Sequence, residues 1–229
     1  MKSTTPLHEI TDAARQGLTG SWGKSIGVML VFLLLFVGIS SIPLVGLVLQ
    51  LLFAAPLLVG LNIYFLATVD RQLNPFELLF EGFGRFGTSW CAHMQVILIM
   101  LAWALPLVAF CVLLPRYVQL DPEIYPPYAD LALQVVPLLI ANIFLIWKML
   151  RYSLVLYVVA DDETVHASAA VRRSSELMQG NCLRLIVLWL RFLGWYLLAV
   201  LTLGIGFLWL IPYMFASMAS FYQDVKDNQ

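Results

Sequence analysis

The chain has 229 residues, of which 61% are hydrophobic and 12% are charged, and its formal net charge is −1. A soluble domain is roughly half apolar and about a quarter charged. The charged residues are too few to cover a water-facing surface, which excludes an ordinary soluble domain and predicts that most of the surface faces lipid. A net charge so close to zero says little about partners, but we expect no nucleic-acid partner.

Residue types that ligate metals or act as nucleophiles are scattered along the chain. The three cysteines and three histidines show no CxxC or paired spacing, so neither a disulfide framework nor a zinc site is indicated. The sequence contains no HExxH, GxSxG, Walker-type or GxGxxG motif. The stretch "ADDET" (Ala160–Thr164) could bind a divalent ion, but one acidic cluster before a helix is more often a cap. We predict no catalytic residues, no metal and no cofactor.

Apolar segments dominate the chain, and about 20 such residues form a helix that crosses the ~30 Å hydrocarbon core. The uncharged turns "SSIPLVG" and "TLGIG" each join two of these segments, which predicts helical hairpins. The sequence therefore predicts an all-α, polytopic membrane helix bundle with six transmembrane helices. They lie at roughly Ser25–Ser41, Leu44–Val69, Cys91–Leu114, Leu133–Ala160, Cys182–Leu201 and Gly204–Phe221.

The ends of the chain and the basic residues predict how it is threaded. The polar start differs from a cleavable signal peptide, so we expect the mature chain itself to anchor the protein. Lys and Arg accumulate in cytoplasmic connections, and the acidic loop after the third span carries Arg116 alone. We predict that both termini are cytoplasmic, with an N-terminal amphipathic segment (1–24), a transmembrane domain (25–222) and a cytoplasmic tail (223–229). The basic residues on that side are Lys2, Arg15, Lys24, Arg71, Arg85, Arg172, Arg173, Arg184 and Lys226.

Amphipathic helices are predicted along the cytoplasmic side of the membrane. Between Pro75 and Phe86, aromatic and leucine side chains recur at helical spacing, with Glu77 and Glu81 on the opposite face. This pattern is typical of an interfacial helix. The N-terminal segment shows a similar pattern, and the stretch from Asp161 to Gly180 predicts a third helix that packs against protein. The apolar positions are Phe76, Leu79, Phe80 and Phe83 in the first segment and Leu7, Ile10, Ala14, Leu18 and Trp22 in the N-terminal one.

Three basic residues, Lys148, Arg151 and Arg191, lie inside apolar segments, and no Asp or Glu lies within the predicted spans. If the fourth helix continues to Asp161, Arg151 and Lys148 lie ~15 and ~20 Å from its inner end. Such charges either extend towards the headgroups and set the depth of the helix, or they form a site for an anionic ligand such as a lipid phosphate. We predict that all three converge on one inward-open, partly hydrated cavity.

Three stretches of the C-terminal half form a distinctive set. They are "YSLVLYVVADDE" (Tyr152–Glu163), the "SSELMQG" helix (Ser174–Gly180) and, most specific of all, the run from Phe192 to Tyr222, which begins "FLGWYLLAVLTLGIG". In these stretches the chain resembles the bacterial membrane-protein family known as domain of unknown function 975. "GSWGKSIGVML" and "EGFGRFG" are similar to the family's first span and interfacial segment. The resemblance implies an integral bacterial membrane protein with several spans, and it implies no activity and no catalytic residues.

The leading hypothesis is a non-enzymatic integral protein of the bacterial cytoplasmic (inner) membrane. Its basic inner cavity would bind anionic lipid, a partner protein, or an anionic or peptide solute. The alternative is a small transporter or channel subunit that works as a homo-oligomer, although the order of long and short loops does not suggest the inverted repeats of many transporters. A membrane-embedded enzyme that acts on lipid headgroups through Asp161, Asp162 and Glu163 ranks last.

Overall fold

The computed structural model describes residues 3–43, 45–72, 75–117 and 128–228. Every regular element in these ranges is a helix, so the prediction of an all-α protein is confirmed. Most of the acidic loop predicted after the third span lies outside the described residues. The helices are α1 (Leu7–Leu18), α2 (Trp22–Ser40), α3 (Val45–Val69), α4 (Leu78–Glu81), α5 (Phe86–Tyr117), α6 (Tyr128–Arg151), α7 (Val155–Asp161), α8 (Ala167–Leu177), α9 (Cys182–Leu201) and α10 (Phe207–Asp227).

Within the described residues, five segments are long and apolar enough to cross a membrane. They overlap the first five predicted spans, which confirms the prediction of several membrane helices. The predicted sixth span, Gly204–Phe221, falls mostly within α10, which is not among the five and which carries Ser217, Ser220 and a polar last turn. The five segments are Trp22–Ser40, Val45–Val69, Phe86–Leu113, Val135–Asp161 and Cys182–Leu201.

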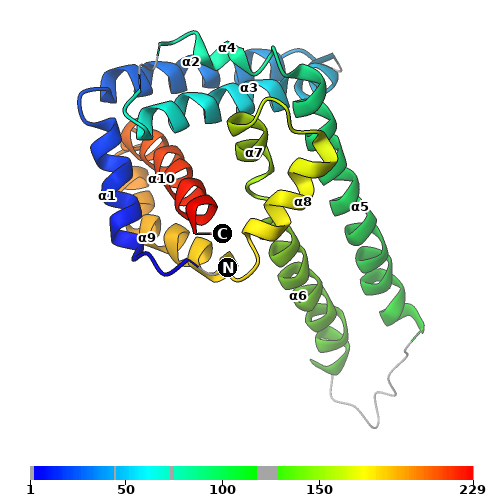
Figure 1. The fold of residues 1–229 in the computed structure, drawn as a ribbon. Coiled ribbons are helices and arrows are strands. Elements are labelled where there is room, and N and C mark those ends of the chain that lie inside the picture. The colour runs from blue at the N-terminus through cyan, green and yellow to red at the C-terminus, as the bar shows by residue number, and fades with distance from the viewer. Residues whose placement is uncertain (1–2, 44, 73–74, 118–127, 229) are drawn as a thin grey trace.

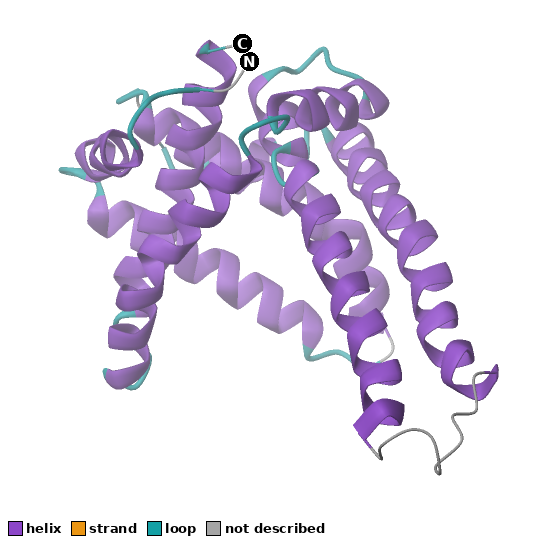
Figure 2. Ribbon diagram, turned by 90° about the horizontal axis from the view of Figure 1, so that it is seen from below, coloured by secondary structure: helices purple, strands orange, loops and turns teal. Residues whose placement is uncertain are grey.

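The helices form a packed body from which one long hairpin projects. Helix α10 lies at the centre of this body, beside α1, α3 and α9, and the α5–α6 hairpin extends away from it (Figure 1). The two termini lie close together, at the end of the molecule opposite the tip of the α5–α6 hairpin (Figure 2). Ser3 links these ends, because its Oγ donates to Asp224 Oδ2 at 2.8 Å and its N–H donates to Asn181 Oδ1 at 3.2 Å.

Helix α1 occupies the predicted N-terminal amphipathic segment and separates its two faces cleanly. Its buried face carries Ile10, Ala14 and Leu18, while Glu9 and Asp12 on the other face are exposed. The buried face packs against protein, chiefly against α10 and α3. The placement of α1 at a membrane surface stays a prediction.

The segment from Pro75 to Phe86 differs from the single interfacial helix that its phenylalanine spacing predicts. Its helical part is α4 alone, which is flanked by turns and packs on α3 with Leu79 buried. Gly60 and Gly82 allow this close packing, because a Cβ on Gly60 would overlap the Leu79 carbonyl and one on Gly82 would overlap the Pro56 carbonyl. Tertiary contact with α3 therefore replaces a longer regular helix.

Candidate functional site

The predicted fourth span contains a break in its helix immediately after its two basic residues. Helix α6 ends at Arg151, residues Tyr152–Leu154 form a turn, and α7 begins at Val155. Two hydroxyl groups bond to carbonyls at the end of α6. Ser153 Oγ donates to Leu150 O at 2.8 Å, and Ser174 Oγ, from α8, donates to Arg151 O at 3.0 Å. Irregular backbone within an apolar span is stable only where such groups are bonded by protein or water.

Lys148 lies in the last turn of α6 against three aromatic rings. Its Nζ is 4.5 Å from the ring centroid of Trp103, on α5, and 5.4 Å from those of Phe144 and Trp147. An ammonium at this distance from a ring face is attracted by the negative face of the π system. The carbonyl end of α6 adds a partial negative charge that favours a cation in this turn. Within the described residues, Lys148 is thus stabilised by aromatic rings and the end of α6, and no carboxylate pairs with it.

Arg151 and Arg191 differ in their surroundings. The guanidinium of Arg151 is 5.3 Å from the ring centroid of Trp147, which therefore contacts both basic residues of α6. Arg191 is exposed on α9, a helix that contacts α6. It lies nine residues after Cys182, a rise of ~13 Å along the helix axis. The structure thus brings Lys148 and Arg151 together on one ring, and a cavity shared with Arg191 stays a prediction.

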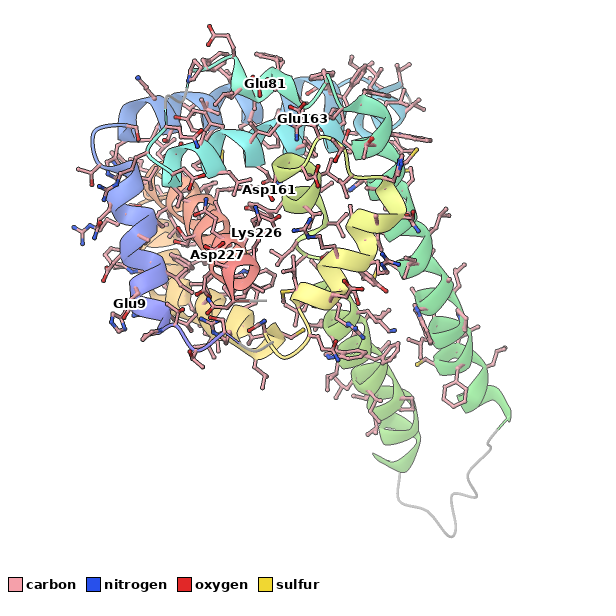
Figure 3. All side chains as sticks on the ribbon, viewed as in Figure 1. Glu9, Glu81, Asp161, Glu163, Lys226 and Asp227 are labelled. Carbon is pink, nitrogen blue, oxygen red and sulfur yellow. The ribbon has the colours of Figure 1, made fainter. Side chains whose placement is uncertain are left out.

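The basic residues near the two termini are paired differently. Arg184 Nη1 lies 3.0 Å from Asp224 Oδ2 in a mostly buried ion pair. Lys226 Nζ lies 2.7 Å from Asp161 Oδ2, and Figure 3 shows these side chains between α7 and α10. Arg85, Arg172 and Arg173 also pair with carboxylates. No ion pair in the described part of the chain includes Lys148, Arg151 or Arg191.

The three consecutive carboxylates at the end of α7 bind separate partners. Asp161 bonds to Lys226 and accepts a hydrogen bond from Tyr222 at 2.9 Å, while Glu163 pairs with Arg85 at 2.6 Å. Asp162 Oδ1 accepts bonds from the hydroxyl and the backbone N–H of Thr164, which lower the pKa of the Asp162 carboxyl. Among the residues that the structure describes, no group of three or more His, Cys, Asp or Glu side chains is placed to hold a metal ion.

Sequence reasoning missed the groups that stabilise Lys148 and the break. Phe144 lies four residues before Lys148 on the same helix, and this spacing could have indicated its ring contact. Trp147 is the immediate neighbour of Lys148, and that spacing does not predict a contact. Trp103 and Ser174 come from α5 and α8, so the local pattern gave no signal for them.

The family described as "Protein of unknown function (DUF975)" matches residues 1–229. No curated protein and no solved structure matches the chain. The match extends over both the broken fourth span and the α9–α10 hairpin, and the chain therefore belongs to this DUF975 family.

Proposed function

We propose that this chain is an integral protein of the bacterial cytoplasmic membrane that binds anionic phospholipid headgroups of the inner leaflet through Lys148, Arg151 and Arg191. The observation that carries the proposal is the difference in pairing among its basic residues. The described ion pairs use Arg85, Arg172, Arg173, Arg184 and Lys226 and none of these three. Arg15, Lys24 and Arg71 also form no described ion pair, and the three proposed residues differ from them by lying on helices α6 and α9. A lipid phosphate is the anion most abundant where such residues meet a membrane.

The length of α6 supports this placement of the charges. The helix has 24 residues, so its length is ~36 Å and exceeds the ~30 Å hydrocarbon core. Helix α6 alone is long enough to cross, and its last turn then reaches the headgroup region. In this arrangement Lys148 and Arg151 lie near the phosphates, and α7 and α8 belong to a layer at the cytoplasmic surface. The proposed cytoplasmic position of both termini agrees with their closeness in the fold (Figure 2).

The site suits an amphipathic anion because charge and aromatic surface adjoin. Lys148 and Arg151 are each partly exposed, so both can donate to a phosphate while their stems remain on the rings. Ile143, Ile146 and Met149 on α6 are exposed and offer apolar surface to an acyl chain. The proposal involves no catalytic step.

Lipid retention in native mass spectrometry tests this function. The variants Lys148→Gln, Arg151→Gln and Arg191→Gln are compared with Arg172→Gln, a matched control whose side chain is 79% exposed on α8 and pairs with Glu176. We expect the three variants to retain less phosphatidylglycerol than the parent chain, with unchanged retention of phosphatidylcholine. Arg172→Gln should resemble the parent. Unchanged retention of phosphatidylglycerol in all three variants would refute the proposal.

A transporter or channel subunit is the second candidate, and the broken fourth span favours it. Discontinuous helices form the substrate sites of many transporters, usually as a matched pair in two structural repeats. In the described part of the chain, α3 and α10 contain Pro56 and Pro212 yet continue as helices through them. The absence of a matched second break there supports lipid binding over transport. Anion flux into liposomes that contain the purified protein would favour transport over lipid binding.

A further inference from the structure

The tip of the α9–α10 hairpin is almost wholly apolar and uncovered. Its turn, Thr202–Gly206, exposes Leu203 by 96% and Ile205 by 61%, and the adjoining Leu201 by 77%. Arg191 is the last charged residue before the turn and Asp224 is the first after it. Exposing these leucines to water on the far side of a membrane would cost free energy, whereas exposing them to hydrocarbon would not.

Several polar groups of this turn are bonded within the hairpin. Thr202 Oγ1 donates to Ala199 O at 2.8 Å and accepts from the Gly206 N–H at 3.0 Å, while the Gly204 N–H donates to Ala199 O at 3.0 Å. The positive φ of Gly204, 91°, allows this tight reversal. Such bonds lower the cost of placing irregular backbone at membrane depth.

Helix α1 shows how short the free part of the hairpin is. The Tyr213 hydroxyl, on α10, donates to Thr11 O on α1 at 3.3 Å. Tyr213 lies seven residues after Gly206, a rise of ~10 Å. Beyond that point α10 is covered by α1, whose opposite face exposes Glu9 and Asp12 to solvent. On the α10 side, therefore, the apolar tip extends ~10 Å past a helix with carboxylates on its surface.

One cavity connects the polar helix directly with the turn. It has a volume of about 420 Å³ and is lined by Arg15 of α1 together with Thr202 and Gly206 of the turn. Arg15 is exposed, and no described ion pair includes it. A guanidinium in this state is costly in hydrocarbon, so Arg15 lies outside the hydrocarbon core. The cavity also contains Trp22, Trp195 and Trp209, and tryptophan prefers the membrane–water interface.

The α9 arm sets a similar limit on how deep the turn lies in the membrane. Arg191 is exposed ten residues before Leu201, which places it ~15 Å from the turn. With Arg191 at the phosphates, the tip reaches about half of the ~30 Å hydrocarbon core. On both arms, the distance from the last polar group to the turn is too short for the turn to reach the opposite leaflet. Helix α9 as a whole is nevertheless long enough to cross.

We infer that the α9–α10 hairpin enters and leaves the membrane through the leaflet nearer the termini, and that its turn is surrounded by the acyl chains of the bilayer interior. The hairpin is a membrane-insertion surface whose partner is hydrocarbon, held at its depth by Arg15, Arg191 and the tryptophans. The other four candidate spans are even in number, so the termini remain on one side. The α9 part of this inference rests on the proposed function through the position of Arg191, whereas the α10 part does not depend on it.

Cysteine accessibility combined with depth-dependent quenching tests the inference. The natural cysteines, Cys91, Cys111 and Cys182, are first replaced by Ser. Single cysteines are then introduced as Leu203→Cys or Ile205→Cys in the turn. Asn228→Cys, beside the C-terminus, and Glu123→Cys, in the acidic loop, report the two sides. Closed vesicles of each orientation are treated with a membrane-impermeant maleimide, and a bimane label at each site is exposed to lipids brominated at different chain depths.

We expect both turn cysteines to lose labelling from either side and to react once the membrane is dissolved in SDS. Bimane at the turn should be quenched most by bromines deep in the acyl chain. Labelling of both turn cysteines from the side that labels Glu123→Cys would show that the hairpin crosses the membrane. Labelling from the side of Asn228→Cys, or a turn fluorophore that no brominated lipid quenches, would equally overturn the inference. The second turn position serves where the first variant fails to fold.

Discussion

The contact between Lys148 and Trp103 supplies a measurable coupling energy. The Lys148 Nζ lies 4.5 Å from the Trp103 centroid and 5.4 Å from each of the other two rings, so Trp103 is the nearest ring. Cation–π contacts contribute about 0.5–1 kcal/mol when exposed and ~2 kcal/mol when desolvated. Because Lys148 is half-buried, we expect a coupling of about 1 kcal/mol between the two side chains.

A double-mutant cycle isolates this coupling from the other effects of each substitution. The free energy of unfolding in mixed micelles is measured for Lys148→Met, Trp103→Leu and the double variant. The control cycle replaces Trp103→Leu with Trp189→Leu, which removes a tryptophan exposed on α9. We expect the control pair to be additive. Additivity within ~0.3 kcal/mol for the Lys148 and Trp103 pair as well would refute the role assigned to the ring.

Two further predictions concern the break and the acidic segment at the end of α7. Ser174→Ala should lower the free energy of unfolding by about 1 kcal/mol, because the Arg151 carbonyl loses a hydrogen bond. Chemical denaturation measures this loss, with the Ser175→Ala variant as the control. Equal stability of the two variants would contradict the prediction. Asp162 has a lowered pKa in the folded chain, so its stabilising effect is complete above the unfolded value of about 4 and is lost as pH falls through the folded value. Thermal unfolding of the Asp162→Asn variant should therefore lack this acid-side loss, and parallel pH profiles for variant and parent would argue against it.

The sequence predicted the features of this fold that depend on composition and period. Apolar runs located the five described segments that are long and apolar enough to cross a membrane, and the spacing of Ile10, Ala14 and Leu18 indicated the buried face of α1. These signals are local, because a lipid-facing segment needs about 20 apolar residues whatever its neighbours are. The short α4 lies beyond such reasoning, since its packing depends on Gly60 and Gly82 approaching backbone from another segment.

The break after Arg151 shows why the candidate site was harder to predict. Most residues on both sides of the break are apolar apart from Lys148 and Arg151, so hydropathy indicates one continuous helix. The break is stabilised by Ser174, which reaches Arg151 O from α8, 23 residues along the chain. A hydrogen bond of that kind depends on tertiary packing and leaves no periodic signal. The depths of ~15 and ~20 Å were calculated for an unbroken helix, whereas α6 ends at Arg151 and α7 begins at Val155.

The position of the break also accounts for the two basic residues that precede it. An α-helix that ends inside a protein leaves its last carbonyls without helical partners and concentrates a partial negative charge there. Lys148 and Arg151 occupy this last turn, so their positive charges offset the helix end while hydroxyls bond two of its carbonyls. The same residues would be costly in the middle of a continuous span. Charge and break therefore stabilise each other, and a break without the cations, or cations without the break, would be the less stable arrangement.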